Sequence, residues 1–249
     1  MAGNLTEISD MVIAITGASR GIGAATARLL AGRGAAVVLG ARSAGDMANV
    51  AAEIERDGGR VTTWPTDVRR RADLHGLVER ATSEFGRLDV LVGNAGIGPI
   101  SPMDDLRVDD WDAMIDVNLR GILNGIAAAL PVFRAQQAGH FVNVASTAAY
   151  KTVPGQAVYA ATKTAVRVLT DGLRQEVGPD IRVTLISPGF TDTDFVESVP
   201  DERQRKEMTA SRERFAMPAD AVARAIAYAI EQPAKVNVGE LVLRSSSQP

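Results

Sequence analysis

The fold is decided by one stretch near the start of the chain, MVIAITGASRGIG, residues 11–23. Its first half, Met11–Thr16, is a continuous apolar run of strand length, which is typical of a strand buried on both faces of a parallel sheet. A turn that contains three glycines follows and opens a helix, which we predict over Gly21–Gly34. A buried strand that passes through such a turn into a helix indicates the first unit of a layered α/β fold.

The rest of the 249-residue chain continues this alternation. Further strands are predicted at Ala36–Ala41, Arg60–Thr66, Leu88–Asn94, His140–Ser146, Arg182–Ser187 and Glu240–Leu243. Further helices are predicted at about residues 46–57, at Ala72–Phe85, and at about residues 109–137, 156–177 and 219–231. We therefore predict an α/β protein with a doubly wound, Rossmann-type parallel sheet in three layers (α/β/α). No linker, repeat or low-complexity tract interrupts residues 1–249, so we expect a single domain.

The composition excludes several kinds of chemistry. The chain has no cysteine and two histidines, His75 and His140, so thiol nucleophiles, disulfides, cysteine-ligated metals and the usual multi-histidine metal site are excluded. A net charge of −3 argues against a general nucleic-acid binder, and the only basic run, Arg69–Arg71, is more typical of a solvated helix start. We therefore predict no metal site and no nucleic-acid partner.

The first residues of the sequence show no targeting pattern. They contain Asn4, Glu7 and Asp10 where a secretory signal would have a basic region followed by an apolar one. No uninterrupted apolar run approaches the roughly 20 residues of a membrane span. We therefore expect a cytoplasmic protein without a membrane partner.

One segment, about Thr191–Met217, breaks the alternation. It is rich in charge of both signs and carries scattered apolar side chains. A loop of this length in a compact domain is usually functional or disordered. We interpret the segment as a substrate lid, with a merely solvated helix as the alternative.

The glycine turn has the features of a dinucleotide site. Glycines there let a pyrophosphate approach the backbone, and the N–H groups that open the next helix attract its charge. The position between a buried strand and an amphipathic helix supports this interpretation, which a lone glycine cluster would not. The candidate cofactor-binding residues of the turn are Gly17, Ser19, Arg20, Gly21, Ile22 and Gly23.

The end of the second predicted strand indicates which dinucleotide binds. An NAD site usually places a carboxylate about 20 residues beyond the glycines to hold the ribose 2′-hydroxyl. Here Ala41 occupies that place, Arg42 follows it, and Arg20 lies in the glycine turn. Two guanidinium groups can hold a 2′-phosphate through charge-assisted hydrogen bonds. We therefore expect NADP(H) rather than NAD(H), with two ordinary surface arginines as the alternative.

A second group of residues is a candidate for catalysis. Tyr159 and Lys163 are four residues apart on the helix predicted from about residue 156, so their side chains share one face. Ser146 ends the preceding predicted strand, at the edge where open α/β sheets bind their ligands. A simple surface contact between the cation and the phenol is the alternative.

Seven short motifs lie in order along the chain. They are Thr16-Gly17-x-x-x-Gly21-Ile22-Gly23, Asp67-Val68, Asn94-Ala95-Gly96, Asn118, Ser146, Tyr159-x-x-x-Lys163, and Pro188-Gly189 followed by Thr193. With these motifs the chain resembles a classical short-chain dehydrogenase/reductase over essentially its whole length. Many members of this family have two asparagines before Ala-Gly, and Gly93 stands in the place of the first one. We expect little consequence, because Asn94 is kept.

The resemblance implies a role for each catalytic candidate. Tyr159 would protonate the carbonyl oxygen as hydride arrives from the nicotinamide, and would act as the base in the reverse direction. Ser146 would hydrogen-bond the substrate carbonyl. Lys163 would hold the nicotinamide ribose, and Asn118 would anchor a water that links Lys163 to solvent. A free phenol has a pKa of about 10, and we expect a Lys163 ammonium about 4–5 Å away to lower the pKa of Tyr159 by about two to three units.

The resemblance also extends the cofactor site. Asp67 and Val68 would contact the adenine, with Asp67 as a simple helix cap the alternative. Asn94, Ala95 and Gly96 would lie near the adenosine ribose. The remaining cofactor positions would be Tyr159, Lys163, Pro188 and Gly189, together with Thr191 and Thr193 near the carboxamide and pyrophosphate. The Pro188-Gly189 pair can also simply end a strand.

The substrate pocket would be lined mainly by apolar residues. By position these are Ile97, Gly98, Ala148, Ala149, Tyr150 and Phe190, with lid residues such as Phe195 and Phe215. No fixed arginine or lysine obviously awaits a carboxylate or phosphate there. We therefore predict an NADPH-dependent oxidoreductase that interconverts a small-molecule ketone or aldehyde of modest polarity and its alcohol.

Other functions stay open. The ending Pro233-x-x-Val236-Asn237-Val238-Gly239-Glu240-Leu241 is similar to that of NADP-dependent 3-hydroxy acid and serine dehydrogenases of the family. This similarity keeps a hydroxy acid as the second substrate class, with a basic lid residue as its anion contact. A non-catalytic dinucleotide sensor is a remote alternative, since the catalytic residues are intact. The family resemblance also implies a homotetramer or homodimer.

Overall fold

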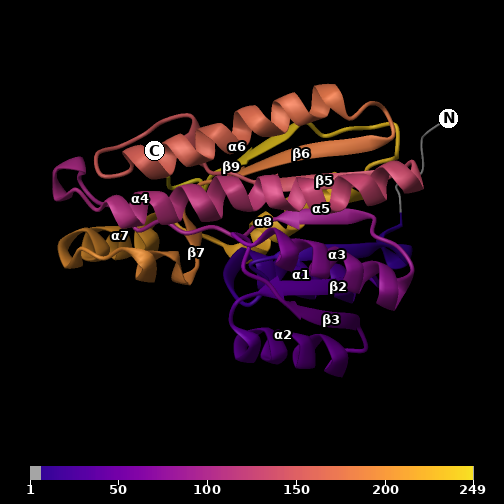
Figure 1. The fold of residues 1–249 in the computed structure, drawn as a ribbon. Coiled ribbons are helices and arrows are strands. Elements are labelled where there is room, and N and C mark those ends of the chain that lie inside the picture. Colours follow the sequence, from indigo (N-terminus) through magenta and orange to yellow (C-terminus); the bar gives the residue numbers. More distant parts are fainter. Residues whose placement is uncertain (1–6, 249) are drawn as a thin grey trace.

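The computed structural model describes residues 7–248, which form a three-layered α/β fold (Figure 1). Its centre is a seven-stranded parallel sheet with the strand order β3-β2-β1-β4-β5-β6-β9. The strands are β1 Val12–Thr16, β2 Ala36–Ala41, β3 Arg60–Pro65, β4 Val90–Gly93, β5 Gly139–Val144, β6 Ile181–Pro188 and β9 Glu240–Leu243. The predicted doubly wound, Rossmann-type sheet is therefore confirmed.

Helices cover both faces of the sheet. One face carries α1 (Gly21–Gly32), α2 (Ala44–Arg56) and α8 (Ala219–Glu231). The other carries α3 (Arg71–Phe85), α5 (Gly121–Gln136) and α6 (Ala157–Glu176). Short 3-10 turns lie at η1 (Ile8–Asp10), η2 (Met103–Asp105) and η4 (Thr147–Ala149).

Strand β1 shows why the sequence selects this arrangement. Ile13 and Ile15 belong to the core layer shared with α1 and α8, whereas Val12 and Ala14 belong to the layer shared with α3 and α5. Because successive side chains of a strand point to opposite faces, a strand covered on both faces must be apolar throughout. The parallel strands also end at one edge of the sheet, so the loops that follow them gather there.

The helix predicted at about residues 109–137 is not one regular helix. Helix α4 (Val108–Met114) leads into a π-helical turn, η3 (Ile115–Arg120), before α5 begins. An apolar period does not reveal such a turn, and the prediction of a regular helix was wrong in this respect. Turns of this kind are often found at functional sites, and the buried Asn118 lies in this one.

Within the described part of the chain, this stretch also has the length and apolar composition to cross a membrane. It runs from Val108 to Gln136, and half of its most apolar window is buried inside the protein. Burial of this kind is what a core helix against a sheet shows.

Residues 191–217, which we call the α7 segment, are ordered rather than an irregular loop. Strand β7 (Thr191–Asp192) pairs in parallel with β8 (Met217–Pro218), so the segment leaves and rejoins the domain at neighbouring points. Between them lie the 3-10 turn η5 (Asp194–Ser198) and helix α7 (Glu202–Phe215), which has no buried residue. The segment is therefore mainly an exposed helix capped by Asp201, the conformation named as the alternative, and its role as a substrate lid stays a prediction. Figure 1 shows α7 and β7 together at one end of the molecule.

A buried arginine closes the opposite edge of the sheet. Arg182 in β6 is 9% exposed and donates to the carbonyls of Ala229, Ile230 and Gln232 at 3.2, 2.9 and 3.0 Å. Carbonyls at a helix C-terminus lack partners within the helix, and a cation is favourable at that end. Arg182 therefore anchors the end of α8 to the sheet.

His140 in β5 lies beside this arginine and is buried. Its Nε2 lies 2.8 Å from the hydroxyl oxygen of Thr184, which itself donates to the carbonyl of Val238. Burial, and then the charge of Arg182, hold the pKa of His140 well below its ordinary value. The imidazole is therefore neutral at physiological pH.

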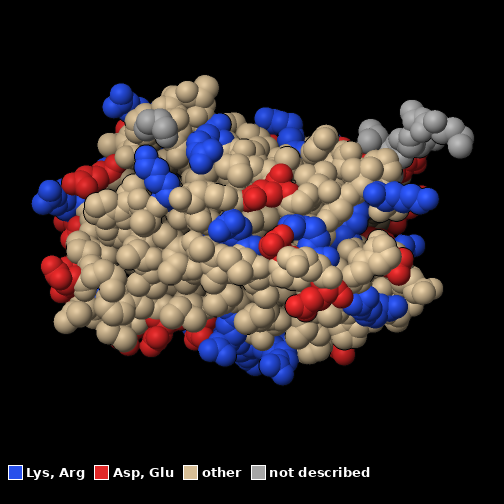
Figure 2. Space-filling model, turned by 90° about the horizontal axis from the view of Figure 1, so that it is seen from above, with Lys and Arg blue, Asp and Glu red and all other residues tan. Residues whose placement is uncertain are grey.

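Charged side chains do not gather by sign on the face shown in Figure 2. Basic and acidic residues lie interspersed there, next to a broad area without charge. Such a surface has no extended basic patch of the kind that a nucleic-acid backbone requires.

Candidate active site

The glycine turn between β1 and α1 exposes backbone N–H groups at the carboxyl edge of the sheet. Gly17 and Gly21 have φ angles of +66° and +56°, a conformation that favours glycine. A Cβ on Gly23 would lie 2.2 Å from the carbonyl oxygen of Gly17, so helix and loop pack directly together. Ser19 lies in the loop, and Ile22 packs against the core. No side chain caps the start of α1, so the turn fits the pyrophosphate of a dinucleotide.

Thr16 and Asn94 fix this turn against the end of β4. The Thr16 hydroxyl accepts hydrogen bonds from the backbone N–H groups of Asn94 and Ala95 at 3.0 and 3.1 Å. The Asn94 amide donates to the carbonyls of Thr16 and Gly17 at 2.9 and 3.2 Å. The glycine turn and the Asn-Ala-Gly motif, both predicted to bind the cofactor, are therefore held together.

The start of the α7 segment lies on the same turn. A Cβ on Gly21 would lie 3.1 Å from the methyl carbon of Thr193, so the Thr193 side chain packs against the backbone of Gly21. Arg20 Nη1 lies 3.9 Å from the Asp194 carboxylate and 3.7 Å from that of Glu197. The predicted phosphate ligand Arg20 thus faces two carboxylates of η5, in pairs that are largely exposed and therefore weak.

The Pro188-Gly189 pair ends β6 and turns the chain into the α7 segment. The Thr191 hydroxyl donates to the carbonyl of Gly189 at 3.1 Å. The Thr193 hydroxyl accepts from the backbone N–H of Phe195 at 3.4 Å and so caps η5. Both threonines thus fix the local path of the chain across the glycine turn.

At the predicted adenine end, Asp67 is held by Arg69. Arg69 Nε donates to the two Asp67 carboxylate oxygens at 2.9 and 3.0 Å, and the Arg69 backbone N–H donates to one of them at 3.1 Å. These hydrogen bonds lower the pKa of Asp67, and the charge of Arg42 contributes. Val68 is buried. The Asp67 carboxylate therefore organises the turn into α3, and its ring-binding role stays a prediction.

The end of β2 offers no carboxylate at the expected position. Ala41 is buried at the last position of the strand, and Arg42 is exposed. Ser43 then caps α2, accepting from the backbone N–H of Asp46 at 3.4 Å and donating to the Asp46 carboxylate at 2.7 Å. Arg42 therefore lies next to a helix N-terminus, a position that favours anions.

Ser146, Tyr159 and Lys163 come together where β5 ends. Ser146 accepts from the backbone N–H of Ala148 at 3.1 Å, and its side chain hydrogen-bonds the Tyr159 hydroxyl. Lys163, one helical turn beyond Tyr159, is 4% exposed and donates from Nζ to the carbonyl of Val144 at 3.0 Å. Its Nζ lies 5.9 Å from the centre of the Tyr159 ring.

Burial controls the ionisation of this group. It raises the pKa of Tyr159 to about 12, because desolvation of the phenolate outweighs the hydrogen bond from Ser146. Burial of the ammonium lowers the pKa of Lys163 to about 8. The predicted lowering of the Tyr159 pKa by Lys163 is therefore wrong for this arrangement. The prediction counted the Coulomb attraction between Lys163 and the phenolate, but it left out the free-energy cost of removing both groups from water.

Asn118 links the loop after β4 to the catalytic helix. Its Oδ1 accepts from the backbone N–H of Ile97 at 2.9 Å, and its Nδ2 donates to the Ile97 carbonyl at 2.9 Å and to the Thr162 hydroxyl at 3.1 Å. A Cβ on Gly96 would lie 3.3 Å from Lys163 Nζ and 3.4 Å from Asn118 Oδ1. Asn118 and Lys163 therefore flank the same glycine, and the water-anchoring role of Asn118 stays a prediction.

Phe195 of η5 lies against Tyr159, the predicted catalytic acid. Its ring centre lies 5.5 Å from that of Tyr159, with an angle of 60° between the planes. Its ring also fills the space over Gly98, where an added Cβ would lie 2.1 Å from the Phe195 ring. The surface next to the Tyr159 ring is thus apolar, and part of it comes from the α7 segment.

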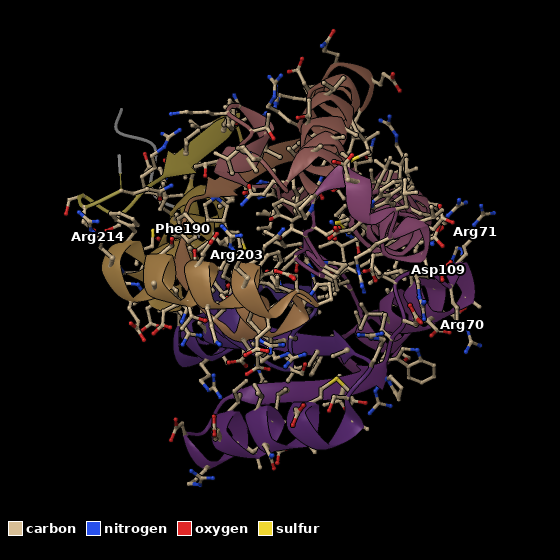
Figure 3. The ribbon with its side chains drawn as sticks, turned by 90° about the vertical axis from the view of Figure 1, so that its left-hand side faces the viewer. Arg70, Arg71, Asp109, Phe190, Arg203 and Arg214 are labelled. Carbon is tan, nitrogen blue, oxygen red and sulfur yellow. The ribbon has the colours of Figure 1, made fainter. Side chains whose placement is uncertain are left out.

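The other predicted substrate residues contact different parts of this edge. Ala148 is buried, and Tyr150 is 42% exposed with its hydroxyl 3.2 Å from that of Ser187 at the end of β6. The rings of Phe190 and Phe215 lie 6.5 Å apart at the base of the α7 segment. Figure 3 shows Phe190 next to α7. Phe195 is therefore the predicted lid residue that contacts the catalytic tyrosine.

Several residues of the site were not among the sequence candidates. Thr16 and Thr162 hold motif residues in place, and Thr16 directly precedes the glycines, which was a usable signal. The pairing of Asp194 and Glu197 with Arg20 had no such signal, because it depends on the path of the α7 segment.

This geometry is that of an oxidoreductase that works with a bound dinucleotide. The sequence model of a family described as short chain dehydrogenase matches residues 11–204. The chain is also 42% identical to an uncharacterised oxidoreductase of Staphylococcus saprophyticus, over 98% of this chain and 99% of that protein. The chain belongs to the short-chain dehydrogenase/reductase family.

Solved structures agree with this assignment. An alcohol dehydrogenase from Thermococcus sibiricus, complexed with 5-hydroxy-NADP, has a TM-score of 0.85 and 33% identity, covering 96% of this chain and 98% of that one. The closed form of a serine dehydrogenase complexed with NADP+ has a TM-score of 0.88 and 28% identity, with 96% of each chain covered. A family member from Burkholderia phymatum in complex with NAD has a TM-score of 0.88 and 26% identity, covering 95% of this chain and 90% of that one.

Proposed function

We propose that this protein is an NADP(H)-dependent oxidoreductase that interconverts a small ketone or aldehyde and the corresponding alcohol. The observation that carries the proposal is the meeting of Ser146, Tyr159 and the buried Lys163 where β5 ends, with Lys163 Nζ 5.9 Å from the centre of the Tyr159 ring. Two neighbouring hydroxyls can direct their hydrogens at one carbonyl oxygen. Ser146 would orient that oxygen, and Tyr159 would give it a proton. When bound, the reduced nicotinamide would supply the hydride.

The ionisation of Tyr159 favours the direction of reduction. With a pKa of about 12, the phenol is fully protonated at neutral pH, as an acid must be before it donates. Lys163, with a pKa of about 8, is mostly an ammonium at the same pH and can stabilise the phenolate left after the transfer. In the oxidation direction the high pKa would oppose proton removal by Tyr159.

The cofactor preference rests on the charges at the adenosine end. Arg42 follows the buried Ala41 and adjoins the start of α2, while Arg20 lies in the glycine turn. A 2′-phosphate could therefore meet two guanidinium groups, and no carboxylate stands at the end of β2 to hold a ribose hydroxyl. NADP-bound alcohol and serine dehydrogenases of similar fold support this preference, and the NAD-bound relative marks the alternative.

The substrate class rests on the surface around Tyr159. Phe195 and Gly98 make it apolar and narrow, which favours a carbonyl compound of modest polarity. The similarity to serine dehydrogenase favours a 3-hydroxy acid as the second candidate. Helix α7 carries Arg203, Arg205 and Lys206, from which an anion contact could come.

The test is a panel of ketones, aldehydes and hydroxy acids, assayed with NADPH and NADH through nicotinamide absorbance. Turnover of a ketone or aldehyde with NADPH, and its loss in Tyr159→Phe with unchanged NADPH binding, would support the proposal. Turnover of no carbonyl compound would overturn it. Arg42→Asp should weaken binding of NADPH far more than that of NADH, and an unchanged ratio would overturn the cofactor assignment.

We also propose self-association, as a homotetramer or homodimer. Ile115, Leu123 and Val168 of η3, α5 and α6 are 41%, 44% and 60% exposed, and these helices offer apolar side chains to a second copy of the chain. Light scattering after size-exclusion chromatography measures the assembly, and a monomer at micromolar concentration would contradict the proposal.

A further inference from the structure

The last described residues of the chain fold back onto the base of the α7 segment. The backbone N–H of Gln248 donates to the carbonyl of Ser245 at 3.0 Å, and the hydroxyls of Ser245 and Ser247 lie 2.8 Å apart. These bonds form a local turn. This turn, residues 245–248, directly follows β9, and we call it the C-terminal turn.

Gln248 contacts the point where the α7 segment begins. Its side-chain oxygen accepts from the backbone N–H of Phe190 at 3.2 Å. It also packs on Gly189, where an added Cβ would lie 2.2 Å from that oxygen. A side chain at residue 189 would thus displace Gln248. The carbonyl of Phe190 accepts from the backbone N–H of Met217, at the far end of the segment, at 2.9 Å.

Ser247 contacts the end of the α7 helix. Its hydroxyl donates to the carbonyl of Arg214 at 3.2 Å. The carbonyls in the last turn of a helix accept no hydrogen bond from within the helix, so a donor from outside stabilises that end. Figure 3 shows Arg214 at the end of α7, beside the C-terminal part of the ribbon.

The C-terminal turn therefore binds both ends of the α7 segment. One contact holds the backbone of Phe190, where the segment leaves β6, and the other holds the last turn of α7. The segment carries Phe195, which lies against Tyr159. A change in how the ends are held would alter the placement of Phe195 over the catalytic tyrosine.

We propose that Gln248 is a positioning residue for substrate binding. By holding the Phe190 backbone, it sets the placement of the α7 segment and hence the shape of the surface against Tyr159. The proposal rests on the proposed function, in which a carbonyl substrate binds next to Tyr159 and Phe195. Gln248 touches neither Tyr159 nor the glycine turn in the structure, so its effect should fall on substrate binding rather than on cofactor binding.

The test compares three variants of the full chain. Gln248→Ala removes the acceptor, Gln248→Glu keeps an oxygen at the same reach, and Ser246→Ala is the matched control because Ser246 is an exposed residue of the same turn. Because Gln248→Ala loses one hydrogen bond, we expect it to raise the KM for the carbonyl substrate about 5-fold and to leave the Kd for NADPH unchanged. Gln248→Glu should restore most of the affinity, and Ser246→Ala should match the wild type.

Hydrogen exchange provides a readout that does not depend on turnover. Amides of the α7 helix should exchange faster in Gln248→Ala than in Ser246→Ala, with no change in β1 or α1. Equal α7 exchange and equal KM in those two variants would overturn the proposal. If the wild type turns over no carbonyl compound, the proposed function fails, while the exchange rates still decide whether Gln248 holds the segment.

Discussion

Replacing Phe195 by alanine should lower the pKa of the catalytic tyrosine. The Phe195 ring lies 5.5 Å from the Tyr159 ring, and burial raises the pKa of Tyr159 to about 12. An exposed phenol has a pKa of about 10, so the burial to which Phe195 contributes disfavours the phenolate by at most about 3 kcal/mol. Opening that side to water should return about one to two pKa units, which would raise the phenolate fraction at pH 9 about 10- to 100-fold.

The assay is a spectroscopic titration of phenolate absorbance. The chain has three tyrosines, so the signal of Tyr159 is isolated by subtracting the same titration in the Tyr159→Phe background. In alcohol oxidation the rate should also rise at lower pH in Phe195→Ala than in the wild type, because Tyr159 is the proposed base in that direction. Phe215→Ala is the control, since Phe215 belongs to the same segment but packs against Phe190. A Tyr159 pKa that stays near 12 in Phe195→Ala would refute the reasoning.

Three further predictions follow from other contacts. Replacing Asp194 by Asn and Glu197 by Gln frees Arg20 from two exposed ion pairs of about 0.2–1 kcal/mol each. NADPH should therefore bind about 2- to 30-fold more tightly at low salt, and titration at high salt should show a smaller gain. His140 is buried with a depressed pKa, so below its unfolded pKa of about 6.5 the unfolded state binds more protons. The free energy of unfolding should therefore fall by about 1 kcal/mol between pH 7.5 and 5.5, and urea unfolding should show a smaller fall in His140→Phe. Arg182→Leu should lower the free energy of unfolding by about 2–4 kcal/mol, since it removes the guanidinium donors to the carbonyls of Ala229, Ile230 and Gln232, and a denaturation midpoint equal to that of the wild type would contradict this role.

The parts of the site that depend on local spacing could be predicted from the sequence. Tyr159 and Lys163 share a face because they are one helical turn apart, and the glycine turn follows from its place between a buried strand and a helix. The π-helical turn at Asn118 could not be predicted, because one extra residue per turn leaves the apolar pattern almost unchanged. The charge pattern of the segment that carries Phe195 left a substrate lid and a solvated helix open, and the contact of Phe195 with Tyr159 could not be predicted because it depends on the path of the segment.

The ionisation of the tyrosine shows why the remainder needed three-dimensional structure. The spacing of Tyr159 and Lys163 gives the sign and size of their attraction, but desolvation depends on what covers them. Here Phe195, remote in sequence, covers the phenol, and the Val144 carbonyl holds the ammonium. Both are set by tertiary packing, and together they reverse the direction predicted for the pKa of Tyr159.

The 3-10 turn η5 joins the two halves of the site. Its Asp194 and Glu197 lie near Arg20 at the glycine turn, while its Phe195 lies on Tyr159. A five-residue turn capped by Thr193 is too short to let one side move independently of the other. An anion bound beside Arg20 would repel the carboxylates of Asp194 and Glu197. Because these carboxylates and Phe195 belong to the same short turn, a charge at the cofactor end acts on the turn that covers Tyr159.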